Sequence, residues 1–213
     1  MKSILIYGGT FNPPHFGHIK TASAVQHHFG YDEVYFLPCK QPVLKSECEV
    51  TPNNRADMVR LAIAPHKHFR IDLREIKRDT PSYMVDTLKD IRDSLGNNVS
   101  ITLLIGTDAL LTLPQWEQWE ELITYCNILV IKRNIPNGET VSDPLKTFIN
   151  QQITTNKNEL TTKPFGCFFF FNAGEYDVSS SSIREKIKTH QSTDSLLLGS
   201  VQKYIKEHHL YQD

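Results

Sequence analysis

The sequence predicts an α/β protein in which a mainly parallel, doubly wound sheet is covered by helices on both faces. Short apolar segments of strand length alternate with stretches whose apolar residues recur at helical spacing. Glycine and proline separate many of these segments, and no repeat, low-complexity tract or linker interrupts the alternation. Such alternation favours a parallel sheet. We therefore expect a single domain over residues 1–213, with a serine-rich segment and a helical end at about 178–213.

Most of the expected strands are continuous apolar runs, as is typical of strands that are buried on both faces. The first run is SILIY, Ser3–Tyr7, and Pro38 stops the second, EVYFL. The expected strands are 3–7, 33–37, 69–73, 100–106, 127–132 and 167–171.

The expected helices carry start and stop signals. Gly30 can end the first helix, Thr51 can cap a second one that begins with proline, and Gly96 can end a third. A short helix is expected over 144–153, and two amphipathic helices close the chain. The residues expected to face inward in the first three helices are Ile19, Ala22, Val25, Phe29, Met58, Leu61, Ala62, Val85, Leu88, Ile91 and Leu95.

The composition argues against several classes of function. The formal charge is −1, from 23 basic and 24 acidic residues, so no global basic field exists and we expect no nucleic-acid partner. The 4 cysteines are scattered without a CxxC pair, which indicates free thiols in a reducing compartment. The apolar run at the N-terminus stops at Gly8, too early for a signal peptide or a membrane span. We expect a cytoplasmic protein with no membrane partner.

The segment YGGTFNPPHFGH, Tyr7–His18, has the features of a phosphate-binding loop. Gly8 and Gly9 directly follow the first strand, and ligands of open α/β sheets lie beyond the carboxyl ends of the strands. The next helix is expected to begin near His15, so its positive N-terminal end points to the same place. The dinucleotide and Walker glycine patterns are absent. A zinc site would need a third ligand beside His15 and His18, and no suitable residue is near, so we predict no metal site.

This loop resembles the GGTF-D/N-P-x-H-x-G-H signature of the nucleotidyltransferase superfamily, which has a Rossmann-like fold. Asn12 stands where many members have Asp. In that superfamily the histidines contact the phosphates of ATP and the glycine loop lies against the adenosine. The resemblance therefore implies ATP-binding roles for Gly8, Gly9, Thr10, Phe11, His15 and His18.

A second segment, VSSSSIREKI at 178–187, resembles the second signature of the superfamily, I-S-[ST]-T-x-I-R. By themselves, four serines before an amphipathic helix can simply cap that helix. They also place hydroxyl and amide groups at a second helix N-terminus, with Arg184 one turn inside. The resemblance adds Ser181, Ile183 and Arg184 to the ATP site and implies that His15, His18 and Arg184 are catalytic.

Between these signatures the chain resembles the nicotinate mononucleotide adenylyltransferase family. The matching segments are REIKRDTPSYMVDTL at 74–88, IGTDALLTLPQWEQWEEL at 105–122 and VIKRN at 130–134. The family's backbone after Ser-Tyr meets the nicotinate carboxylate, and its tryptophan stacks on the pyridine ring. The resemblance implies that Gly106 and Asp108 contact ATP. The implied residues of the mononucleotide site are Asn12, Lys45, Tyr83, Met84, Asp108, Trp116 and Arg133.

Two departures from this family stand out. Met84 replaces the common threonine, and the loop LPCKQPVLK, 37–45, lacks the family's histidine, which leaves Lys40 or Lys45 to meet a phosphate. The implied reaction joins ATP, with its Mg²⁺, to nicotinate mononucleotide and gives nicotinate adenine dinucleotide and pyrophosphate in NAD biosynthesis. Several alternatives stay open. The acceptor could instead be nicotinamide mononucleotide or phosphopantetheine, or the protein could be a nucleotide-binding sensor without activity. Assembly into a homo-oligomer is also open.

Overall fold

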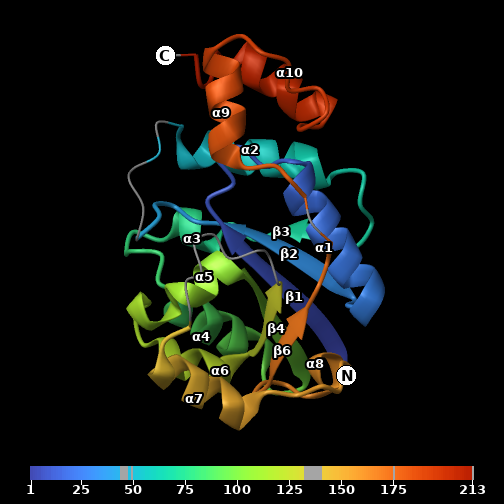
Figure 1. Ribbon diagram of the computed structural model, residues 1–213, viewed down its shortest axis with the longest axis vertical. Coiled ribbons are helices and arrows are strands. Elements are labelled where there is room, and N and C mark those ends of the chain that lie inside the picture. Colours follow the sequence, from blue (N-terminus) through green and yellow to red (C-terminus); the bar gives the residue numbers. More distant parts are fainter. Residues whose placement is uncertain (44–47, 49, 132–140, 175, 213) are drawn as a thin grey trace.

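The computed structural model describes residues 1–43, 48, 50–131, 141–174 and 176–212. Its centre is a sheet of six parallel strands in the order β3-β2-β1-β4-β5-β6 (Figure 1). The strands are β1 (Lys2–Gly9), β2 (Glu33–Pro38), β3 (Phe69–Ile71), β4 (Val99–Gly106), β5 (Asn127–Ile131) and β6 (Phe168–Phe171). The predicted parallel sheet is confirmed.

Helices connect successive strands and close the chain. The longer ones are α1 (Phe16–Phe29), α2 (Pro52–Ile63), α4 (Met84–Leu95), α7 (Asp143–Gln152), α9 (Ser180–Lys188) and α10 (Gly199–Glu207). The shorter ones are α3 (Arg74–Lys77), α5 (Thr107–Leu111), α6 (Leu122–Tyr125), α8 (Glu159–Thr162) and the 3-10 turns η1 (Leu113–Gln115) and η2 (Trp119–Glu121). The expected signals act as predicted: the Thr51 hydroxyl accepts a hydrogen bond from the Asn54 amide at 3.2 Å, and Gly30 ends α1 at a φ of 75°.

Two apolar cores lie on opposite faces of the sheet, as its double winding requires. Leu5 of β1 joins the core that contains residues of α1, α2, α8, α9 and α10. Its neighbours Ile4 and Ile6 join the other core, with residues of α4, α5, α6 and α7. Helices on both faces are thereby confirmed.

Three details of the expected elements were wrong. The first strand extends through Gly8 and Gly9, which pair with Leu37 and Pro38 of β2 and were expected to follow the strand. The third strand ends at Ile71, not at residue 73, because the Asp72 carboxylate accepts the Arg74 amide at 2.9 Å and starts the turn into α3. Leu95 does not face the core: at the last position of α4 it is 42% exposed, while Val85, Leu88 and Ile91 are buried.

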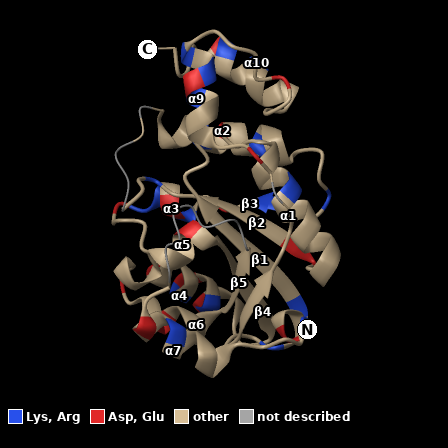
Figure 2. Cartoon of the chain, viewed as in Figure 1, with Lys and Arg blue, Asp and Glu red and all other residues tan. Residues whose placement is uncertain are grey.

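β1 and β4 are parallel neighbours at the centre of the sheet. The strand order reverses between them, because β2 and β3 follow β1 on one side and β5 and β6 follow β4 on the other. Ligands of open α/β sheets bind at the carboxyl ends of the strands at such a reversal. Charged residues of both signs are interspersed over the surrounding helices, and β4, β5 and β6 carry none (Figure 2). No helix in the described part of the chain is long and apolar enough to cross a membrane.

Candidate functional site

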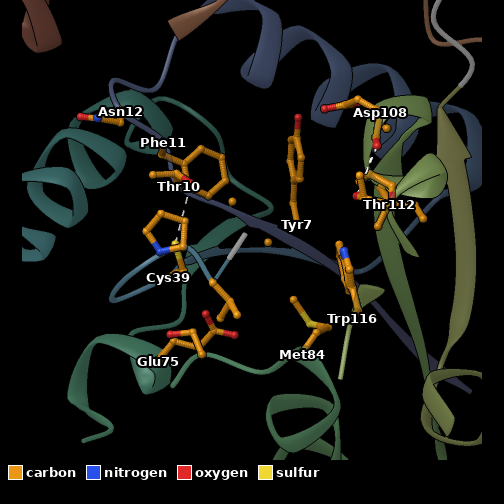
Figure 3. Close-up of a pocket in the computed structure, with 18 of the residues that line it drawn as sticks. Tyr7, Thr10, Phe11, Asn12, Cys39, Glu75, Met84, Asp108, Thr112 and Trp116 are labelled. Carbon is orange, nitrogen blue, oxygen red and sulfur yellow. Dashed lines mark hydrogen bonds between the residues drawn. The ribbon is translucent and has the colours of Figure 1, made fainter. Parts of the chain in front are cut away.

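A cavity of about 880 Å³ opens at the carboxyl ends of β1 and β4, where the strand order reverses (Figure 3). Its size is that of a site for a small organic ligand. Several segments that are far apart in the sequence line it. Of the residues predicted for the site, the lining includes Gly8, Gly9, Thr10, Phe11, Asn12, His18, Tyr83, Met84, Gly106, Asp108, Trp116, Ser181 and Arg184.

Glycines at the ends of β1 and β4 let other groups approach the backbone closely. A Cβ atom on Gly8 would lie 2.8 Å from the methyl carbon of Met84, and one on Gly106 would lie 2.5 Å from a carboxylate oxygen of Asp108. Real Cβ atoms do not make contacts this short. The two glycines therefore bring the mouth of the sheet into contact with side chains from α4 and α5.

The two histidines stand at the start of α1, with their ring centroids 3.7 Å apart. His15 is the N-cap, is 4% exposed and does not line the cavity, whereas His18 does. The His15 amide donates to Nδ1 of His18 at 3.2 Å. Because Nδ1 accepts this bond, the proton of the neutral His18 ring belongs on Nε2. This arrangement makes Nε2 of His18 a hydrogen-bond donor.

The serine-rich segment caps α9 and also contacts the glycine loop. The Ser179 hydroxyl accepts from the Ser182 amide at 3.1 Å, which is the capping role that the sequence suggested. The Ser180 hydroxyl donates to the Pro13 carbonyl at 2.9 Å, and Nη1 of Arg184 donates to the Asn12 carbonyl at 2.8 Å. The two superfamily signatures therefore meet at one place, about 170 residues apart in the chain.

The other end of the cavity is apolar and begins at α4. Tyr83, Met84 and Trp116 pack on the core that lies against this face of the sheet, and Met84 and Trp116 point into the cavity (Figure 3). The Tyr83 amide is engaged, since it donates to the Pro81 carbonyl at 2.9 Å. Met84 occupies the first position of α4, where the amide has no acceptor within the helix. Of the two predicted backbone donors, Met84 is thus the better placed.

Several predicted residues lie elsewhere. Ile183 is fully buried in the core and does not line the cavity. Lys45 and Arg133 fall outside the described residues. The Lys40 ammonium group turns to the Arg78 carbonyl at 2.8 Å and the Asp79 carboxylate at 3.1 Å. Among the residues that the structure describes, no three His, Cys, Asp or Glu side chains gather as a metal site.

Arg55 of α2 holds two of the lining loops together, and sequence reasoning missed it. Its guanidinium group is fully buried and donates to the carbonyls of Thr10 at 2.7 Å, Cys39 at 2.8 Å and Lys40 at 2.7 Å. These carbonyls belong to the loops that follow β1 and β2. An arginine in an amphipathic helix gives no signal in the sequence that it faces inward.

Glu75 of α3 is a second residue that sequence reasoning missed. Its carboxyl lines the cavity, is 2% exposed and accepts a hydrogen bond from the Thr87 hydroxyl at 2.8 Å. Burial raises the pKa of Glu75 to about 7, although Thr87, the positive charge of Arg78 and the Ser82 hydroxyl lower it. In the sequence, a glutamate between basic residues, as in REIKR, is typical of an exposed helix. The burial of Glu75 could therefore not be predicted from this pattern.

Comparisons with known proteins agree with the geometry. The profile of a family described as cytidylyltransferase-like matches residues 6–186. A Legionella pneumophila protein named probable nicotinate-nucleotide adenylyltransferase is 47% identical over 212 residues, which are 100% of both chains. A Marinomonas protein of the same name is 36% identical over 100% of this chain and 96% of its own.

A solved structure shares the fold. The Plasmodium falciparum nicotinic acid mononucleotide adenylyltransferase complexed with NaAD superposes with a TM-score of 0.71 at 20% identity, over 99% of this chain and 98% of that one. The match of the family profile and the similarity to the curated relatives over their whole length lead to the same assignment. This chain belongs to the cytidylyltransferase-like family and, within it, to the nicotinate-nucleotide adenylyltransferases.

Proposed function

We propose that this protein transfers the adenylyl group of ATP to nicotinate mononucleotide, forming nicotinate adenine dinucleotide and pyrophosphate in NAD biosynthesis. One observation carries the proposal. The two nucleotidyltransferase signatures meet at a cavity whose other end presents a helix start and a tryptophan. Membership in the family supports the same reaction.

The reaction is an in-line displacement at phosphorus. An oxygen of the mononucleotide 5′-phosphate forms a bond to the α-phosphorus of MgATP, and the bond from that phosphorus to the bridging oxygen of the β-phosphate breaks. The nucleophile is already an anion, so the protein needs no strong base. Its contribution is to position the two phosphates and to neutralise charge.

His18 and Arg184 are the groups that supply this neutralisation. The Nε2–H group of His18 donates to the α-phosphate oxygens, on which charge increases in the transition state. Arg184, one turn inside α9, holds the outer phosphates with its remaining donors. His15 is buried behind His18 and acts through its amide, which sets the His18 tautomer. Mg²⁺ arrives as part of the ATP substrate.

The α4 end of the cavity distinguishes the acceptor. A carboxylate on the pyridine ring accepts from the Met84 amide at the positive end of α4, and the ring stacks on Trp116. A carboxamide would direct its own NH₂ group at such donors, and each mismatch costs about 1–3 kcal/mol. We therefore expect nicotinate mononucleotide to be preferred over nicotinamide mononucleotide by about 5- to 150-fold in kcat/KM for the one mismatch at the Met84 amide.

The test is pyrophosphate release from ATP with nicotinate mononucleotide, nicotinamide mononucleotide and phosphopantetheine in turn. Turnover with the first alone, and a loss of about 10²–10³ in kcat for His18→Ala, are the expected results. Equal kcat/KM values for the two mononucleotides would contradict the proposed preference and indicate an adenylyltransferase that accepts both nicotinate and nicotinamide mononucleotide. No turnover with any acceptor, together with ATP binding, would make it a nucleotide sensor.

A further inference from the structure

The loop that carries Asn12 is held largely by the last 34 residues of the chain, which begin at Ser180. Three of its contacts with this segment involve α9 and the stretch after it: Ser180 with Pro13, Arg184 with Asn12, and the Phe16 amide, which donates to the Leu196 carbonyl at 3.0 Å. The fourth contact comes from the last residues. The Tyr211 hydroxyl donates to Oδ1 of Asn12 at 2.6 Å, across 199 residues of sequence.

The chain reverses after α10 in a way that buries Tyr211. The Leu210 amide donates back to the Ile205 carbonyl at 3.0 Å, and both His209 and Tyr211 have positive φ angles, 50° and 63°. Residues other than glycine adopt this conformation at a cost, and they keep it only where surrounding contacts impose it. Tyr211 is 7% exposed and belongs to the core that also contains residues of α1, α2 and α10. The contacts of Tyr211 thus hold residues 209–211 in this strained backbone conformation.

Asn12 itself is 9% exposed and is bound on two sides. Its side-chain oxygen accepts from Tyr211, and its main-chain carbonyl accepts from Arg184. In Figure 3 the Asn12 carboxamide extends away from the centre of the cavity. The side chain therefore anchors the loop, and because Asn12 also lines the cavity, the substrate contact that the family resemblance implied for it stays a prediction.

We propose that Tyr211 is a positioning residue, whose hydroxyl fixes Asn12 and with it the loop of residues 10–15 that leads into His18. This inference rests on the proposed function for its kinetic readout. It assigns to the end of the chain a role in nucleotide binding, although Tyr211 does not line the cavity.

The test compares single hydroxyl deletions. Tyr211→Phe removes the hydroxyl group that donates to Asn12. Tyr204→Phe is the matched control, because its hydroxyl also ties α10 to the rest of the protein, through Asn54 at 3.1 Å and Asp57 at 3.3 Å, but away from the loop. We expect Tyr211→Phe to lower kcat/KM at least about tenfold, which corresponds to about 1.4 kcal/mol. Tyr204→Phe should stay within about twofold of the unmodified protein.

A double-mutant cycle separates positioning through Asn12 from a general loss of stability. Asn12→Ala should lower kcat/KM as Tyr211→Phe does, and the combination should be no worse than Asn12→Ala alone. Independent, multiplying effects of the two changes would overturn the inference. So would a lower melting temperature of Tyr211→Phe without a kinetic effect.

Calorimetric binding of a non-hydrolysable ATP analogue tests the role of Tyr211 separately from the proposed reaction. If the unmodified protein binds the analogue but forms no product with any acceptor, the proposed function fails. Weaker analogue binding by Tyr211→Phe than by Tyr204→Phe would then still support the inference, and equal binding would end it.

Discussion

Replacing Glu75 with glutamine should change how the stability of this protein depends on pH. The carboxyl is 2% exposed, and burial raises its pKa in the folded state to about 7 from an ordinary value of 4.5. The folded protein therefore keeps this proton over a range in which the unfolded chain has released it. Because the unfolded state then binds fewer protons, the free energy of unfolding falls as pH rises from about 4.5 to 7.

The magnitude follows from the two pKa values. Their separation, at about 1.4 kcal/mol for each pH unit, amounts to about 3 kcal/mol that the folded state loses above neutrality. Glutamine can still accept from the Thr87 hydroxyl, but it does not titrate. The difference in unfolding free energy between Glu75→Gln and the unmodified protein should thus shift in favour of the variant by up to about 3 kcal/mol between pH 4.5 and pH 8.

Urea unfolding at several pH values, followed by circular dichroism, measures this difference directly. Charges elsewhere titrate in both proteins and cancel in the comparison. Glu120→Gln, which changes an exposed carboxyl on η2, is the control for the loss of one acidic side chain. If the difference in unfolding free energy between Glu75→Gln and the unmodified protein is the same at every pH from 4.5 to 8, the reasoning about burial is refuted.

Three further changes test other parts of the site. Arg55→Met leaves three partly buried carbonyls without their donor, and we expect a loss of at least about 2 kcal/mol in urea unfolding; unchanged stability would contradict the role of Arg55 as a tie between the two loops. Gly17→Ala places a Cβ atom 2.7 Å from a methyl group of Val178 and 3.0 Å from the His15 ring, so kcat should fall about tenfold; full activity would mean that α1 and Val178 separate without cost. Arg184→Lys loses the planar fork, so the KM for ATP should rise about tenfold or more while that for the acceptor changes little; an unaltered ATP KM would leave the serine-rich segment as a cap only.

The features that the sequence predicted well are those that depend on local patterns. Apolar runs located all six strands, and Thr51 and Gly30 marked helix ends where the structure has them. The short helices α3, α5, α6 and α8 were not predicted, since elements of four or five residues are too short to display a period. In α4, Leu95 has the spacing of a core residue, but at the last position of the helix it is 42% exposed.

The site was predictable where a long motif describes it and not where packing alone creates it. The two signatures pointed to Gly8, His18 and Arg184, which the fold brings to one cavity, and their roles stay predictions. Arg55 and Tyr211 carry no motif, and Glu75 lies in a segment that matches the family but gives no sign there of its burial. An arginine that binds three carbonyls and a tyrosine that reaches Asn12 look, in the sequence, like ordinary residues of amphipathic helices or of a chain end.

The long span between Asn12 and Tyr211 has a consequence for biosynthesis. A ribosome makes Tyr211 199 residues after Asn12 of the nucleotide loop, to which it binds. At roughly 5–20 residues per second, this interval is about 10–40 seconds. The strands of the sheet can pair during that time, but a nascent chain that has not reached Tyr211 lacks one anchor of its nucleotide loop. Competence to bind nucleotide therefore develops only after Tyr211 has been made, and a chain that stops before Tyr211 would have a folded sheet with an incompletely anchored loop.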